Sequence, residues 1–480
     1  MAAIITEKFR QHNATQFFES FTESSASTYY LFVGKATAYT SSTTGGSDSS
    51  PPTPSDSPSD TEFYAWDSML AAKNVTSSDV SFSIPRRNWV NGTTYDMYDD
   101  NISSSNTTTS GASNLYDSTF YFMTSDFRVY KVLDNNGGTA YSGAEPTSTS
   151  TGPFALGGYV LKYMYQVTTS EAAKYLTSDF IPVSDDSTIS AAAVDGKIES
   201  LKITAGTGYT NGTYYAAVYG DGTSAGTSSG AIIRITVSGG TIQSFGLTAG
   251  SDTTIHAGGA GYTFGTVNLA SGFTFSDTGL SSASAIGGSG GSIEVVISPK
   301  NGHGNSSIVE LGGHFVMTAT TLTQAENDDI TTANDFRQVG LVVDPTNFGT
   351  STVASASTRR QTFVVKASSV SGTFDTDEKI TQATTGAVGK VVEFDSTNSL
   401  LYFQQERFGD FGTNSTTGDH SVFEGTNVIT GATSSATFTP SADSETITLA
   451  NNNTITTVSG YVNPELQADS GNIVYLENRK

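Results

Sequence analysis

Short runs in which apolar and polar residues alternate recur along this chain and predict mostly strands. In residues 81–89, Phe82 and Ile84 alternate with serines, which predicts a short strand with one buried face. Pro85 should end that strand because proline has no backbone N–H to donate. In residues 336–343 the alternation predicts burial of Val339, Leu341 and Val343. The remaining predicted strands are 29–34, 119–123, 127–133, 157–167, 180–183 and 471–479.

Helical periodicity is rare in the sequence. Residues 3–24 carry the best helical pattern, with phenylalanines at positions 9, 17, 18 and 21. Residues 61–73 predict a second, short amphipathic helix. Between them, residues 40–60 are rich in Ser, Thr, Pro and Gly and predict a long surface loop.

Two internal duplications mark the second half of the chain. The motif Gly-x-Ile at 196–198 recurs at 240–242, and Thr-Ala-Gly at 204–206 recurs at 248–250, with the same offset. We expect residues 191–300 to form a small duplicated, Gly-rich β-sandwich, because two copies are too few for a solenoid. In residues 352–461, Phe374 and Ile380 are echoed by Phe423 and Ile429, which predicts a second small β module with a barrel-like shape.

The charge balance narrows the possible partners. The 480 residues include 46 acidic and 23 basic ones, for a net charge of −23 and no cysteine. Such a surface repels phosphates and anionic lipids, so we expect neither nucleic acid nor membrane as a partner. No apolar run is long enough for a transmembrane helix, and the first residues lack a signal-peptide pattern. Disulfides and thiolate metal sites are excluded.

A search for catalytic or metal-binding patterns identifies no convincing constellation. The spacing of His303 and His314 fits no zinc signature, and the acidic loops at 220–222 and 326–329 lack the ligand order of an EF-hand. Gly-x-Ser-x-Gly occurs at 222–226 and 287–291, without the strand and helix that a nucleophile elbow requires. We therefore expect a protein that is not an enzyme and that has no cofactor and no metal.

One local charge inversion stands out in this acidic chain. Arg86 and Arg87 follow the predicted strand directly, and Trp89 is one of only two tryptophans. One interpretation is a solvated basic turn. The other is a docking corner, in which the planar guanidinium groups meet carboxylates of the same chain or of a neighbour. The candidate partner-binding residues are therefore Arg86, Arg87 and Trp89.

Several segments, taken in order, resemble the gene-eight baseplate wedge protein family of T-even-type contractile-tailed phages. The most recognisable motif is Ile-Pro-Arg-Arg-Asn-Trp at 84–89, where the family carries Asp at the position of Asn88. The resemblance covers about half of the chain. The other segments that carry it are 8–10, 30–34, 129–134, 158–165, 336–342 and 471–479.

The resemblance implies a mainly β, multidomain protein with a β-sandwich-like framework and a few short helices. The framework would comprise residues 1–190, 301–351 and 462–480. Residues 191–300 and 352–461 would then be two inserted small β modules, similar to Gly-rich modules of cyanobacterial and marine phages.

The resemblance also implies a function. We expect a structural subunit of the tail baseplate wedge that forms homodimers, contacts the trimeric pin protein and the elongated arm protein, and takes part in the rearrangement at contraction. It would be assembled in the host cytoplasm and reside in the virion. The alternative is a tail adhesin that binds host-surface glycan through the inserted modules, with a polysaccharide depolymerase as a third hypothesis.

Overall fold

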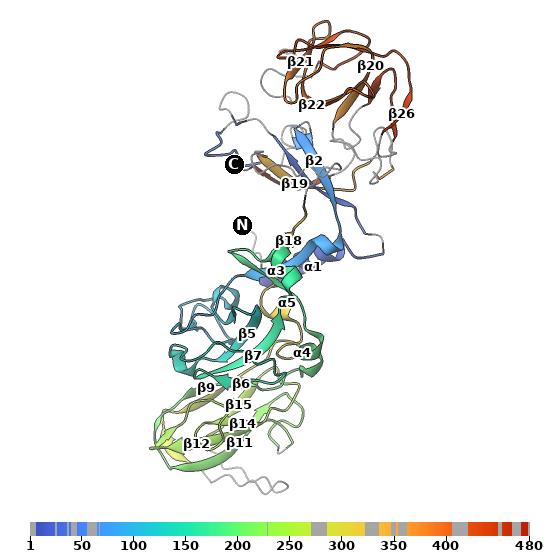
Figure 1. Ribbon diagram of the computed structural model, residues 1–480. Helices are drawn as coiled ribbons and strands as arrows, with labels where there is room; N and C mark the ends of the chain where they lie inside the picture. The colour runs from blue at the N-terminus through green and yellow to red at the C-terminus, as the bar shows by residue number, and fades with distance from the viewer. Residues whose placement is uncertain are drawn as a thin grey trace. The chain divides into compact units, whose positions relative to one another are not determined.

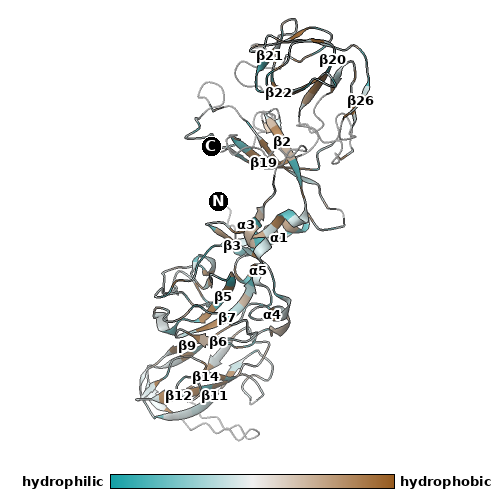
Figure 2. Cartoon of the chain, viewed as in Figure 1, coloured by the Kyte–Doolittle hydropathy of each residue, from teal (hydrophilic) through white to brown (hydrophobic). Residues whose placement is uncertain are grey.

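The computed structural model divides the chain into two compact units, and the fold is mainly β (Figure 1). Unit 1 comprises Met1–Phe18 and Val80–Ala319; unit 2 comprises Glu19–Asp79 and Thr320–Lys480. Hydrophobic residues are concentrated on the strands (Figure 2). The structure describes residues 6–24, 26–35, 38–39, 46–54, 65–66, 68–227, 229–269, 286–321, 336–346, 352–353, 362–405, 421–449, 454–462 and 472–478.

In unit 1, two antiparallel sheets share a core and form a sandwich. The first sheet has the order β18-β3-β8 and the second β4-β5-β7-β6. Phe82 and Ile84 on β3 pack with Val129 and Met164 of the second sheet. Ser83 between them is also buried, at 1 % exposure, so β3 is not buried on one face alone as the alternation predicted. The strands are β3 (Val80–Pro85), β4 (Tyr121–Met123), β5 (Arg128–Asp134), β6 (Phe154–Leu156), β7 (Tyr159–Gln166), β8 (Phe180–Val183) and β18 (Phe315–Thr318).

The helices of unit 1 are short and capped by side chains. The predicted N-terminal helix is present as α1 (Glu7–Glu19), shorter than the pattern suggested. Phe18 stacks on Phe82 of β3, with 4.5 Å between ring centroids, whereas Phe9 is exposed. None of the helices in the described ranges is long and apolar enough to cross a membrane. The others are α3 (Thr169–Tyr175), α4 (Ser187–Ala192), α5 (Ser307–Glu310), and the 3-10 turns η3 (Leu115–Asp117) and η4 (Asn136–Gly138).

The Gly-rich segment of unit 1 forms a sheet of its own. Its strand order is β13-β12-β11-β15-β17-β9, with β14 paired to β12 and with β10 and β16 paired to each other. One core cluster runs beneath it and includes Ile198, Tyr214, Ile233 and Val295. The strands are β9 (Ser200–Thr204), β10 (Thr207–Tyr209), β11 (Gly212–Gly220), β12 (Ile232–Ser238), β13 (Thr241–Ile242), β14 (Thr254–Ala257), β15 (Gly265–Val267), β16 (Gly287–Ser289) and β17 (Ser292–Val296).

The duplication in this segment is preserved at its turns more than in its strands. Gly196 and its repeat equivalent Gly240 both have positive φ, at 61° and 74°. Ile198 and Ile242 are both buried in the same core cluster. The residues that follow differ, because 200–204 form β9 whereas 244–248 form no strand.

Unit 2 contains a four-stranded sheet in the order β2-β1-β19-β29 (Figure 1). The predicted strand at 29–34 is its inner strand β1 (Tyr29–Gly34). Two predictions are corrected here. First, the helix expected at 61–73 is wrong in its second half: residues 65–66 are helical, but β2 (Met69–Val75) is a strand that pairs with β1. Second, in β19 (Gln338–Val343) Leu341 is buried as predicted, but Val339 and Val343 are only half-buried and Val342 is fully buried, because packing covers both faces. The last strand is β29 (Asn472–Asn478).

The C-terminal module of unit 2 is a closed, six-stranded antiparallel barrel. Strands pair in the order β23-β22-β21-β24-β25-β20, and β20 pairs again with β23 to close the ring (Figure 1). Closure leaves no edge strand within the ring. The strands are β20 (Phe363–Ser371), β21 (Lys379–Gln382), β22 (Ala387–Asp395), β23 (Leu400–Gln404), β24 (Ile429–Gly431) and β25 (Thr437–Pro440), with β28 (Tyr461–Val462) beside β20 and a β26–β27 hairpin (Thr446–Thr448, Thr454–Thr456).

The two copies of the duplicated sequence contribute neighbouring strands, β21 and β24, to the wall of this barrel. Thr381 of β21 faces Thr430 of β24, and these two residues are repeat equivalents. The pairs on either side follow the same symmetry. Ile380 faces Gly431 and Gln382 faces Ile429, and exchanging each residue for its repeat equivalent turns one pair into the other. The two copies are therefore arranged about a local two-fold axis, and both anchor phenylalanines are buried in one cluster.

The division into units cuts across the framework predicted from the family resemblance. Framework residues 80–190 fall in unit 1, whereas 320–351 and 462–480 fall in unit 2. The two divisions differ because the units are defined by contacts within the folded chain, whereas the predicted domain boundaries were drawn from sequence similarity to a family. The boundaries at 190, 300, 351 and 461 remain a prediction.

Candidate docking corner

The corner formed by residues 86–89 begins where β3 ends and crosses from one sheet of the sandwich to the other. The backbone N–H of Arg86 donates to Asp179 O at 2.7 Å, which continues the pairing of β3 with β8. Met123 N donates to Arg87 O at 2.7 Å, and Trp89 N donates to Met123 O at 2.8 Å. These bonds attach the corner to the end of β4.

Arg87 points into the protein and is held by its own chain. Its guanidinium carbon lies 4.4 Å from the ring centroid of Tyr121, and Nη2 donates to Tyr116 O at 2.9 Å. Nη1 is buried and has no hydrogen-bond partner. Burial lowers the pKa of Arg87, although Tyr121, Asp96 and Asp117 act in the opposite direction. The stacking on an aromatic ring favours this inward position.

Arg86 lies at the surface. Its Nη1 donates to Thr177 O at 2.6 Å and its Nε donates to Asn88 Oδ1 at 2.9 Å. The amide oxygen of Asn88 therefore serves as an acceptor for Arg86. Among the described residues, neither Arg86 nor Arg87 forms an ion pair with a carboxylate.

Trp89 is half-buried and packs at the edge of an aromatic cluster. Its ring meets Tyr141 edge-on, with 5.9 Å between centroids, and its indole Nε1 is buried without a hydrogen-bond partner. The surrounding cluster includes Tyr95, Phe122 and Tyr159. All three candidate residues are half-buried; Arg87 and Trp89 pack against aromatic rings, whereas the guanidinium group of Arg86 forms hydrogen bonds only with Thr177 and Asn88 among the described residues. Partner binding by any of them stays a prediction.

The two arginines should differ sharply in their contribution to stability. Replacing Arg87 by Met removes a ring contact and a hydrogen bond and should cost about 1–3 kcal/mol in the free energy of unfolding. The matched variant Arg86→Met removes surface contacts and should change it by about 0.5 kcal/mol or less. Chemical denaturation of both variants tests this, and equal losses would contradict an inward role for Arg87.

A buried charge cluster near the corner was not anticipated from the sequence. Lys131 Nζ donates to Glu310 Oε2 at 2.7 Å and lies 2.8 Å from His303 Nδ1. It also lies 3.9 Å from the ring centroid of Tyr98. Gly304 N donates to the other carboxylate oxygen at 2.6 Å. Lys131, His303 and Glu310 are each at least 96 % buried, since their exposures are 0 %, 1 % and 4 %.

We interpret this cluster as one that stabilises the fold. Burial lowers the pKa of Lys131 against the effect of Glu310, and burial beside Lys131 holds the pKa of His303 well below its usual value. His303 is therefore a neutral acceptor for the lysine. The one sequence signal was Lys131 itself, a basic residue within the otherwise apolar run of residues 129–133 in β5.

The other candidate positions are dispersed. His314 lies 3.4 Å from Glu7, away from the His303 cluster. Asp221 accepts hydrogen bonds from the backbone N–H of Thr263 and Phe264 and so closes a loop. Within the described ranges no three His, Asp or Glu side chains are grouped so that they could hold a metal ion. The acidic loop at 326–329 lies outside the described residues.

Comparison with known proteins gives one match. Residues 3–150 match the model of a family described as "Phage-Gp8: Bacteriophage T4, Gp8". This stretch contains α1, β1 to β5 and the whole docking corner. No curated protein matches the chain.

Proposed function

We propose that this protein is a structural subunit of the tail baseplate wedge of a contractile-tailed phage. The observation that carries the proposal is the match of residues 3–150 to the family described as bacteriophage T4 Gp8. This match supports a structural role in a phage baseplate, located in the virion. It also supports a protein whose work is to bind other baseplate proteins and that catalyses no reaction.

The finer proposal concerns partners and assembly. The subunit forms a homodimer, contacts the trimeric pin protein and the elongated arm protein of the wedge, and moves with them at contraction. It assembles in the host cytoplasm. Residues 191–300 and 352–461 are inserted modules of a cyanobacterial or marine phage. In support, each of these segments has strands that pair among themselves.

The corner supplies a specific contact for this role. Arg86 is half-buried at the surface of an acidic chain, and the two hydrogen bonds of its guanidinium group go to neutral oxygens. A carboxylate of a neighbouring wedge protein would be a stronger acceptor for the same planar group. We propose Arg86 as the residue that docks, with Arg87 and Trp89 holding the corner in place.

The test measures the mass of the protein alone and mixed with the other proteins of its baseplate. The native chain should be a dimer that enters a larger complex. Arg86→Glu should weaken this entry by about tenfold or more, because like charges then face each other. Its melting temperature should stay unchanged. Arg86→Gln, which removes the charge without reversing it, is the matched control and should have a smaller effect.

Other outcomes separate the alternatives. A stable trimer that binds glycan and ignores baseplate proteins would contradict the wedge role and favour the tail adhesin. Normal assembly by Arg86→Glu would contradict docking at the corner while leaving the wedge role intact.

A further inference from the structure

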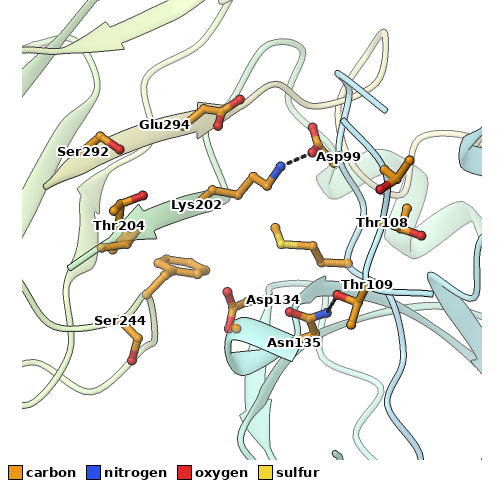
Figure 3. A pocket seen from close by; sticks show the side chains of 15 residues that line it. Asp99, Thr108, Thr109, Asp134, Asn135, Lys202, Thr204, Ser244, Ser292 and Glu294 are labelled. Atoms are coloured by element: carbon orange, nitrogen blue, oxygen red, sulfur yellow. Dashed lines mark hydrogen bonds and ion pairs between the residues drawn. The ribbon is translucent and has the colours of Figure 1, made fainter. Parts of the chain in front are cut away.

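A pocket of about 360 Å³ lies in unit 1 between the loops that flank the sandwich and the Gly-rich sheet (Figure 3). One side is formed by Asp134 and Asn135 at the end of β5, together with Thr107, Thr108 and Thr109. Lys202 of β9 and Glu294 of β17 lie on the other side, and Asp99 is paired with Lys202. The lining combines residues inside the family match with residues beyond it, so the pocket depends on the Gly-rich sheet.

The charges of this pocket do not balance. Three carboxylates line it (Asp99, Asp134 and Glu294) against one ammonium group, that of Lys202. The ion pair between Lys202 and Asp99 uses that single cation. Lys202 and Glu294 face each other in the β9–β17 ladder, but the lysine reaches the aspartate instead. Two carboxylates are therefore left without a cation among the described residues.

Of the three carboxylates that line the pocket, Asp134 is the one whose burial is expected to destabilise the fold. It is 7 % exposed, and Asn136 N donates to its Oδ1 at 2.9 Å. Its Oδ2 accepts no hydrogen bond from the described part of the chain and retains contact with solvent. Burial raises the pKa of Asp134 to about 6, and the charge of Asp252 acts in the same direction. A buried carboxylate without a counter-charge is destabilising, and a cation in the pocket would compensate it.

The lining also argues against other ligand classes. Phe245 is the only aromatic side chain that lines the pocket, and it is 6 % exposed, so it offers little ring face for a sugar to stack on. The described carboxylates are not grouped closely enough to hold a metal ion. The hydroxyl groups of Thr204, Ser244 and Ser292 add neutral acceptors that suit a group with several N–H donors.

We propose that this pocket binds a guanidinium or ammonium group, with Asp134 and Glu294 as its acceptors. The group belongs either to a free small cation such as a polyamine or to a basic side chain of another protein. A chain with a net charge of −23 attracts either source. The proposal does not depend on the wedge role, because it rests only on the shape and charge of the pocket.

The experiment uses the full chain and isothermal titration calorimetry. Agmatine, which carries a guanidinium and an ammonium group, tests the free cation, and an acetylated, amidated Gly-Arg-Gly peptide tests the basic side chain. Glucose is the neutral probe. We expect saturable 1:1 binding of at least one cationic probe. Agmatine as the tighter ligand would indicate a free cation, and the peptide as the tighter ligand would indicate a partner's side chain.

Three variants make the result specific. Asp134→Asn and Glu294→Gln should each weaken binding of the cationic probe by about tenfold or more, because each removes one charged acceptor. Glu424→Gln makes the same change in net charge at an exposed side chain of unit 2 and should bind like the native protein. Thermal melting of each variant confirms that it is folded.

Three results would overturn the proposal: no binding of either cationic probe to the native chain, equal weakening by Glu424→Gln, and binding of glucose that depends on Asp134. The last result would assign the pocket to a saccharide.

Discussion

Replacing Glu310 by Leu is expected to lower the free energy of unfolding of unit 1 by about 3–5 kcal/mol, because it leaves a fully buried ammonium group without its carboxylate. Lys131 is 0 % exposed and would keep only the neutral His303 and the Tyr98 ring as partners. The backbone N–H of Gly304 would lose its acceptor as well. Chemical denaturation followed by tyrosine and tryptophan fluorescence measures the loss.

The double variant Lys131→Met with Glu310→Leu is the control for this result. Removing both charges replaces the ion pair with apolar side chains of similar size, and such exchanges are often neutral. We expect the double variant to recover most of the lost stability. If it is no more stable than Glu310→Leu alone, the unpaired charge is not the cause of the loss.

Asp134→Asn is expected to stabilise the protein at pH 7 by about 3 kcal/mol, since one unit of pKa corresponds to about 1.4 kcal/mol. Burial raises the pKa of Asp134 from 3.8 to about 6 in the folded protein. Between these values the unfolded chain releases its proton first, so stability falls as the pH rises from about 4 to about 6. Asparagine carries no charge and can still accept the hydrogen bond from Asn136.

The pH dependence distinguishes this explanation from a simple packing effect. The gain from Asp134→Asn should be complete above pH 6 and absent below pH 4, as measured by denaturation across that range. Glu424→Gln should show no such gain. A gain of equal size at pH 4 and pH 7 would contradict the desolvated carboxylate. If agmatine binds, it should stabilise the native chain more than the variant at pH 7.

Five strands of the sandwich, β3, β4, β5, β7 and β8, could be predicted because turn residues separate short runs rich in aromatic and β-branched residues. The strand at 29–34 was correct because it is a short, continuous apolar run, and the stop at Pro85 was correct because proline has no backbone N–H to donate. The helix predicted at 61–73 failed in its second half because Met69 and Leu70 suit a strand equally well, and pairing with β1 decided the outcome. On β19, Leu341 was predicted correctly, but the burial of Val339 and Val343 was overestimated and that of Val342 was missed, because packing covers both sides of that strand.

At the docking corner, too, some features could be predicted from the sequence and others could not. The sequence determined that two arginines and a tryptophan follow a strand that ends at proline, since local chemistry requires no distant contact. It could not show that Arg87 turns inward onto Tyr121 while Arg86 stays at the surface. The stacking partner is 34 residues away, and two adjacent residues on an extended chain point in opposite directions.

The sequence by itself determined a mainly β, cysteine-free, acidic chain with two duplications, because these properties depend on composition and local periodicity. Only the tertiary structure decided that the second duplication closes a barrel about a local two-fold axis, that Lys131 is buried against Glu310, and that Asp134 faces a pocket without a counter-charge. Each of these depends on which distant segments pair. Strand register and burial set those contacts, and neither is encoded in the spacing of any single segment.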